Sequence, residues 1–179
     1  MVDQLPEEQV CFRTRKTILE ILKDRGYEID DGDIDQTFEQ FKLNLTSKPS
    51  MNFIAKRVVP DAGEPEDVQE ADLKMEPIFV VFAIDVDKIG RETINKVITT
   101  MEQYTKLNEE DKTITEFLNA ILIVKGGITP IAKKYLEQCE PFMIETFMQE
   151  ELLVNITHHE LVPKHTVLSD SEKQKLLKK

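Results

Sequence analysis

Three short apolar runs separated by two helical patterns constrain the fold of this chain more than any other feature. The first two cover Ile78 to Phe82 and Ala120 to Val124, and the third, Phe142 to Thr146, is apolar only over its first three residues. All three are predicted as strands of a sheet. Helices are predicted between them, one traced by apolar residues from Ile94 to Met101 and one over Thr129 to Gln138. Because strands that alternate with helices imply βαβ crossovers, we expect an α/β fold with a mainly parallel sheet flanked by helices.

Two amphipathic helices and a further strand precede these runs. The first helix is predicted from about Glu7 to Arg25, and a second is predicted through Ile34 to Leu45, since apolar residues recur in both at helical spacing. Phe53 to Val59 is rich in β-branched residues and is predicted as a strand that Pro60 ends. Residues 60–77 are strongly acidic and are bracketed by prolines, so we expect a solvated surface loop there.

The segment from Glu151 to His165 sets an apolar run against polar residues that favour turns, and it holds every histidine of the chain. We expect this run to be a buried strand, since it is short and continuous but for one asparagine: Leu152, Leu153, Val154 and Ile156. Pro163 favours extended backbone at the residue before it, which predicts a second extended piece over Leu161 to Lys164. A capping box at Ser169 to Glu172 predicts one more helix.

The three histidines of this segment raise the question of a metal site. His158, His159 and His165 lie close together in sequence, and neutral imidazole is a common ligand of transition metals. No cysteine lies near them, and in a strand His158 and His159 would point to opposite faces. We therefore predict neither a metal nor a cofactor.

The formal net charge of −11 argues against a chain that binds nucleic acid by itself, because such binding depends on Lys and Arg side chains that displace counterions from phosphates. Any contact with DNA must then be local or imposed by partner proteins. Cys11 and Cys139 are far apart in sequence, as expected of reduced cysteines inside the cell. The sequence has no signal-peptide pattern at its start and no apolar run of membrane-spanning length.

Two acidic patterns imitate metal sites. Asp61, Asp72 and Lys74 fit the loose pattern of a metal-dependent nuclease, in which two carboxylates hold Mg²⁺ and a lysine assists the attacking water. The predicted loop over these residues argues against a nuclease, because such groups need a rigid strand to fix their geometry. The cluster from Asp31 to Asp35 begins like a calcium loop but lacks its glycine and final glutamate, so we expect these acids to stabilise the second helix through its dipole.

The residues around Thr129 have the composition of a helix start. Thr129 can cap a helix whose first position is Pro130, and Gly126 and Gly127 let the backbone turn sharply out of the preceding strand. A capped N-terminus presents free amides and a positive dipole end, so it can approach a phosphate without a net basic charge. A helix start with no further role explains the same residues equally well.

The segment from Glu151 to His165 resembles the opening of the assembly domain in the shared fifth subunit of the eukaryotic nuclear RNA polymerases I, II and III. Four further segments resemble the same family, in the family's order: Arg15 to Ile18, Asp24 to Tyr27, Asp35 to Lys42 and Gly127 to Lys133. Together they span most of the chain. The family's Thr-Pro-Ser-Ala loop corresponds here to Thr129, Pro130, Ile131 and Ala132, with isoleucine in place of the usual serine.

The resemblance implies a non-catalytic subunit in the nucleus that needs no cofactor. Residues 1–145 would form a jaw domain with a restriction-endonuclease-like α/β core, and residues 146–179 would begin a small α+β assembly domain. The loop at Thr129 would lie near downstream DNA. The assembly domain would dock on the largest subunit through one set of residues: Leu152, Leu153, Val154, Asn155, Ile156, His159, Glu160, Leu161, Val162, Pro163 and His165.

Members of that family continue for several elements beyond the helix predicted at Ser169, so we expect a shortened form. A shortened form leaves a second interpretation open, in which the chain is a free regulatory or scaffold protein derived from the subunit. The nuclease is the third interpretation. We expect the polymerase subunit, with other polymerase subunits as partners, duplex DNA only within the complex, and no membrane.

Overall fold

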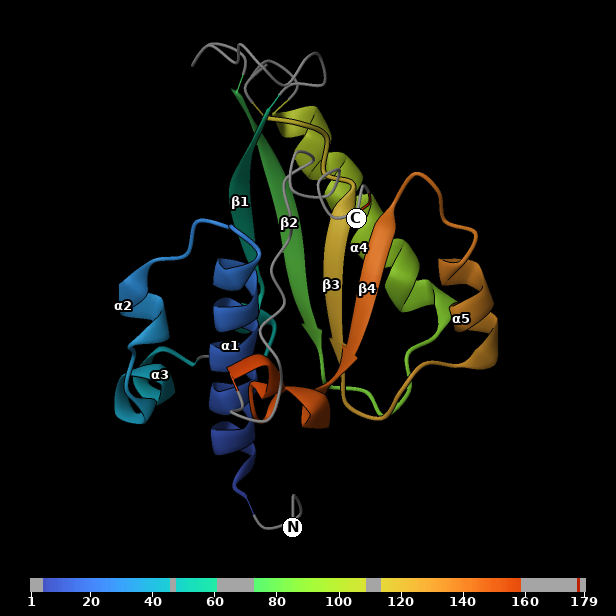
Figure 1. Cartoon of the computed structure of the whole chain (residues 1–179). Helices are drawn as coiled ribbons and strands as arrows, with labels where there is room; N and C mark the ends of the chain where they lie inside the picture. Colours follow the sequence, from blue (N-terminus) through green and yellow to red (C-terminus); the bar gives the residue numbers. More distant parts are fainter. Residues whose placement is uncertain (1–4, 46–47, 61–72, 109–113, 159–176, 178–179) are drawn as a thin grey trace.

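The computed structural model describes residues 5–45, 48–60, 73–108, 114–158 and 177 of the chain, and these residues build a four-stranded sheet with helices on both faces (Figure 1). The strands follow one another across the sheet in chain order: β1 (Phe53–Pro60), β2 (Leu73–Ala83), β3 (Asn119–Val124) and β4 (Met143–Met148). β1 pairs antiparallel with β2, whereas β2, β3 and β4 are parallel. The predicted α/β fold with a mainly parallel sheet is confirmed.

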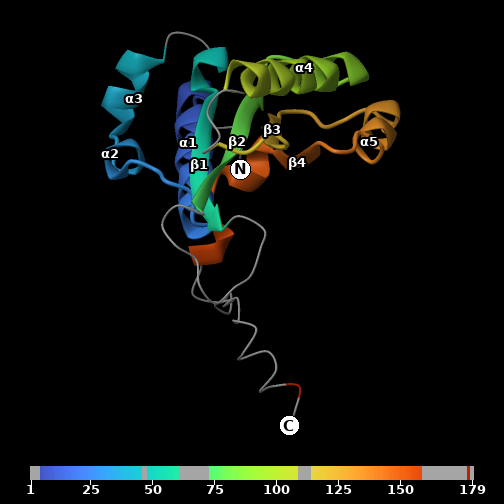
Figure 2. The same ribbon diagram turned by 90° about the horizontal axis from the view of Figure 1, so that it is seen from above.

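Helices cover the sheet in two groups, which Figure 2 shows on opposite sides. On one side lie α1 (Glu7–Asp24), α2 (Asp31–Ile34) and α3 (Phe38–Asn44). The other side carries α4 (Arg91–Leu107) and α5 (Pro130–Leu136), which connect β2 to β3 and β3 to β4. Both crossovers lie on one face because each moves the chain one strand further in the same direction. Among the described helices, none combines the length and the apolar character that a membrane span requires.

The single helix predicted through Ile34 to Leu45 is wrong, because two caps divide it into α2 and α3. Asp30 caps α2, its Oδ1 accepting from the Gly32 amide at 2.7 Å. Thr37 caps α3 in a reciprocal capping box with Gln40. The acids do stand at a helix N-terminus, as predicted, but that helix is only one turn long.

The loop predicted over residues 60–77 is wrong at its C-terminal end, where residues 73–77 already belong to β2. They pair with the second half of β1, and the guanidinium of Arg57 bonds the carboxylate of Glu76 directly across the two strands. The end of the acidic stretch is therefore a strand paired with β1, which the amino-acid composition alone does not reveal. Residues 61–72, including Asp61 and Asp72, lie outside the described residues.

The strands β2 and β3 separate two apolar cores. On the side of α1, Ile121 and Ile123 of β3 pack with Ile18 and Leu22. On the side of α4 and α5 the neighbouring positions of β3 join the second core: Ala120, Leu122 and Val124. Successive side chains of a strand point to opposite faces, so an uninterrupted apolar run is required of a strand that is buried on both.

Candidate functional site

A cleft of about 590 Å³ lies between the C-terminal half of α1 and the chain that follows β4. That chain forms two short 3₁₀ helices, η4 (Gln149–Leu152) and η5 (Ile156–His158), which lie beside α1 in Figure 1. The wall from α1 and β4 consists of Thr17, Ile21, Asp24, Arg25, Thr146 and Phe147. The opposite wall consists of Glu151, Leu152, Val154, Asn155, Ile156 and Thr157. The cleft thus lies between the first helix of the chain and the segment that begins at Glu151, which carries the predicted interface residues.

The turn after β4 is fixed by polar and apolar contacts to the body of the protein. Glu151 caps the turn, its Oε2 accepting from the Met148 amide at 2.7 Å. Gln149 is buried, with its Nε2 3.9 Å from the sulfur of Cys11 on α1. Leu152 is only 2% exposed and belongs to the core on the α1 side. These anchors direct the chain back toward α1 instead of along the sheet.

The strand predicted over Leu152 to Ile156 is therefore wrong, and its apolar residues have different environments. Leu152 is buried and Leu153 is half-buried, whereas the side chains of Val154 and Ile156 are 60% and 67% exposed. The local reason is Asn155, whose Oδ1 accepts from both the amide and the hydroxyl of Thr157, at 3.1 and 2.6 Å. An asparagine that bonds its own backbone two residues on favours a turn over a strand.

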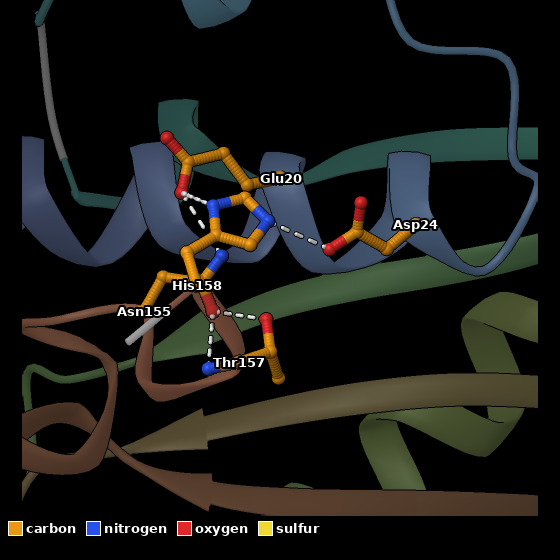
Figure 3. Close-up of polar contacts among 5 residues, drawn as sticks. All are labelled: Glu20, Asp24, Asn155, Thr157 and His158. Atoms are coloured by element: carbon orange, nitrogen blue, oxygen red, sulfur yellow. Dashed lines mark hydrogen bonds and ion pairs between the residues drawn. The ribbon is translucent and has the colours of Figure 1, made fainter. Parts of the chain in front are cut away.

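A polar cluster holds η5 against α1 (Figure 3). Asn155 donates from Nδ2 to Oε2 of Glu20 at 3.0 Å, so both ends of its amide are bonded within the cluster. The ring of His158 lies between two carboxylates, with Nε2 3.0 Å from Asp24 Oδ2 and Nδ1 3.9 Å from Glu20 Oε2. The predicted opposition of His158 and His159 in a strand does not apply, because His158 is part of a 3₁₀ helix and faces α1.

Glu20 and Glu145 were not predicted as site residues, although both bind side chains at this site. Glu20 and Asp24 are four residues apart on α1, which places their carboxylates on one helix face, and this spacing is the signal that could have drawn attention to them. Glu145 of β4 binds the guanidinium of Arg25 at the edge of the cleft. Six predicted interface residues lie outside the described residues: His159, Glu160, Leu161, Val162, Pro163 and His165.

The second predicted site, at Thr129, is a capped helix start as expected. Thr129 Oγ1 accepts from the Ala132 amide at 3.3 Å, and Pro130 occupies the first position of α5. Ala132 is buried, whereas Ile131 at the position of the family's serine is 75% exposed. The geometry of the cap is confirmed, and proximity to DNA stays a prediction.

Two loops meet at this second site, at the carboxyl ends of β2 and β3. Ile89 donates its amide to the carbonyl of Gly127 and accepts from the Thr129 amide, both at 3.0 Å. Exposed cations lie on these loops and on the helices that they open: Lys88, Arg91, Lys125, Lys133 and Lys134. Exposed acids on these loops and on the first turn of α4 are Asp85, Asp87 and Glu92, and Glu92 pairs with Lys96 one turn further along α4. The region is therefore locally basic in a chain with a net charge of −11.

Within the described part of the chain, no group of three or more His, Cys, Asp or Glu side chains is arranged to hold a metal ion. Of the nuclease-like pattern, only Lys74 lies among the described residues. It sits on β2 opposite Val59, so its predicted place in a loop is wrong. Of the calcium-like acids, Asp31 pairs with Lys23, and Asp33 lies 3.7 Å from Arg15. These two acids thus pair with cations of α1.

Comparison with known proteins gives a consistent result over the whole chain. Residues 6–101 match the family model "RNA polymerase Rpb5, N-terminal domain", and residues 154–179 match "RNA polymerase Rpb5, C-terminal domain". The chain is 34% identical to the "DNA-directed RNA polymerases I, II, and III subunit RPABC1" of Caenorhabditis elegans and, equally, to that of Caenorhabditis briggsae. Each alignment covers 99% of this chain and 76% of the relative.

Proposed function

The chain belongs to the Rpb5 family of RNA polymerase subunits, and from this premise we propose that it is a non-catalytic common subunit of nuclear DNA-directed RNA polymerases. The observation that carries the proposal is the identity of 34% over 99% of the chain to subunits shared by polymerases I, II and III. In this role the protein forms part of the lower jaw, beside downstream DNA. It docks on the largest subunit with the residues that follow β4, and it resides in the nucleus.

The chain after β4 has the properties expected of a docking segment. Val154 and Ile156 expose apolar side chains on a part of the backbone that is held in place by Leu152, Asn155 and His158. Apolar area left in water costs about 25 cal/mol for each Å², which a partner surface would recover by covering it. A pre-ordered segment also loses little conformational entropy on binding.

The region around Thr129 has a local charge that suits the approach of DNA. Its exposed lysines and Arg91 give it a local basic character, although the chain as a whole is acidic. A few clustered cations support contact with phosphates inside an assembly but supply little affinity to the isolated chain. We therefore expect the isolated protein to bind duplex DNA with a Kd above about 10⁻⁵ M at physiological salt.

Co-purification tests the proposed assembly. Native tagged protein should bring down the two largest polymerase subunits from a nuclear extract. A Val154→Ser, Ile156→Ser variant should bring down less. Leu107→Ser alters an apolar residue at the end of α4 that is even more exposed, and it should behave like the native protein. Absence of polymerase subunits with every form would exclude assembly. A free regulatory or scaffold protein would then explain the chain better.

Assembled polymerase tests the proposed contact with DNA. Lys133→Glu with Lys134→Glu should weaken cross-linking of this subunit to downstream duplex DNA, because it reverses two charges beside the Thr129 loop. Lys106→Glu, at the far end of α4, is the matched control. Equal cross-linking by all forms would contradict the placement beside DNA.

A nuclease assay tests the remaining alternative. Purified protein with Mg²⁺ should leave DNA uncut, and cleavage that Asp72→Ala abolishes would favour the nuclease instead.

A further inference from the structure

The cleft beside α1 combines an apolar floor with a rim of carboxylates. Ile21 and Phe147 are half-buried and pack against the core, and Val154 and Ile156 extend the apolar surface outward. A volume of about 590 Å³ is in the range of cavities that bind several side chains of a partner or a small ligand. The cleft is thus large enough to take up a short piece of polypeptide.

The charges around this cleft are mostly negative. Asp24 and Glu151 line it, and the carboxylate of Glu20 lies beside Asn155 at its edge. One oxygen of Asp24 contacts His158 and one oxygen of Glu151 accepts from the Met148 amide, which leaves the second oxygen of each for a partner. The guanidinium of Arg25, the one Lys or Arg side chain in the described lining, is already bound by Glu145 at 2.9 Å. A partner therefore meets a surplus of carboxylates at the rim, with apolar atoms between them.

We propose that this cleft takes a basic, apolar segment of another polymerase subunit, with apolar side chains over Val154 and Ile156 and Lys or Arg side chains at Asp24 and Glu151. The inference rests on the proposed function, and it adds the chemistry of the partner segment. Apolar contact would supply most of the affinity. The carboxylates would steer the segment and fix its register, and they would disfavour an acidic segment, including the strongly acidic stretches of a second copy of this chain.

Photo-cross-linking within assembled polymerase tests the inference. A photo-reactive amino acid replaces Val154 in one form and Leu107 in a control form, and cross-linked peptides are identified by mass spectrometry. The reagent at position 154 should capture one segment of another polymerase subunit, in which apolar residues are flanked by Lys or Arg. Position 107 should not capture that segment.

Charge-neutral variants test the rim independently of the apolar floor. Asp24→Asn with Glu151→Gln removes both charges but keeps an acceptor oxygen at each position. The contact of residue 24 with His158 and the cap on the turn after β4 can therefore both be kept. Capture at position 154 should fall about fivefold, because partly exposed charge pairs contribute modestly. Glu102→Gln, an exposed carboxylate on α4, should leave it unchanged.

The outcomes separate this inference from the proposed function. If polymerase co-purifies but position 154 captures an acidic segment, a second copy of this chain or nothing, the cleft does not bind a basic segment and the inference is wrong. Capture that is insensitive to the paired charge variant would likewise contradict the role of the rim. If polymerase does not co-purify at all, the proposed function fails first, and the inference fails with it.

Discussion

Arg25 donates from Nη1 to both carboxylate oxygens of Glu145, at 3.0 and 2.9 Å, and so joins the residue that ends α1 to the edge strand β4 across 120 positions of sequence. Both side chains remain partly exposed to water. The pair lies at the mouth of the cleft, where it neutralises the guanidinium and fixes the separation of the two elements. An ion pair that is partly exposed to water contributes little to the free energy of unfolding, so we expect its main effect to be on the relative position of α1 and β4.

A double-mutant cycle measures what that pair contributes. With Arg25→Ala, Glu145→Ala and the double variant, urea unfolding should give a coupling energy below about 1 kcal/mol, because water screens both groups. A coupling of about 3 kcal/mol would mean that the pair is shielded from solvent in a way its exposure does not indicate.

Leu152 and Ile156 should respond differently to truncation, although the sequence presents them as one apolar run. Leu152→Ala leaves a cavity in the core and should lower the free energy of unfolding by about 2–5 kcal/mol. Ile156→Ala should change it by no more than about 0.5 kcal/mol, since that side chain is mostly in water. Similar losses in urea unfolding would show that both residues belong to one buried segment.

Gly126 stands where the two loops at the carboxyl ends of β2 and β3 approach closely. A Cβ there would lie 1.9 Å from the carbonyl oxygen of Asp87, so Gly126→Ala must displace a loop backbone. We expect a loss of about 1–3 kcal/mol in the free energy of unfolding. Gly90→Ala is the control, because its Cβ would meet no atom within 4 Å. Gly90 is the N-cap of α4, where alanine is less favourable than glycine, but alanine also lowers the entropy of the unfolded chain, so the net cost should be only a few tenths of a kcal/mol. Equal effects would contradict the close approach.

The hydroxyl of Thr129 should contribute to stability through its cap on α5. Thr129→Ala removes the acceptor for the Ala132 amide and should lower the free energy of unfolding, measured by thermal denaturation, by about 1 kcal/mol. Thr129→Ser retains the hydroxyl and should recover most of that loss. If serine and alanine are equivalent, the capping bond contributes nothing and the residue has another role.

Burial raises the pKa of the Cys139 thiol, so its thiolate is disfavoured in the folded protein. The stabilisation from keeping this thiol neutral is complete below its unfolded pKa, near 8.5, and is lost as pH rises through the higher folded pKa. Iodoacetamide at pH 8 should modify Cys139 and Cys11, which are both buried, at least about tenfold more slowly in native than in urea-unfolded protein. Comparable rates would show that these sites open readily.

The sheet could be predicted because its signal is local. The runs at residues 78–82 and 120–124 are buried on both faces, and no other element type explains such short apolar stretches between amphipathic helices. The helix start at Thr129 was equally readable, since the cap and Pro130 follow each other in sequence. The division of the second helix was missed because caps at Asp30 and Thr37 outweigh an apolar period that continues across the break.

The cleft could not be predicted because its contacts are long-range. Nothing in the sequence of residues 151–158 shows that Asn155 and His158 bind α1. His158 and its partner Asp24, for example, are 134 positions apart in the sequence. The apolar run there suggested a strand, yet burial of Leu152 against α1 and the turn at Asn155 prevailed over local propensity. Glu20 and Asp24 of α1 can be recognised as site residues only when the turn at Asn155 is known to lie beside them.

Because neighbouring residues of β3 pack into different cores, a substitution at one position does not require a compensating substitution in the other core. A larger side chain at Ala120 must be accommodated by α4 and its neighbours, whereas a change at Ile121 concerns only the residues packed on the α1 side. Each half of the protein can therefore accumulate compensating changes without disturbing the other. The side of the sheet that carries α1 and the cleft and the side that carries α4 and α5 can therefore evolve separately on one shared backbone.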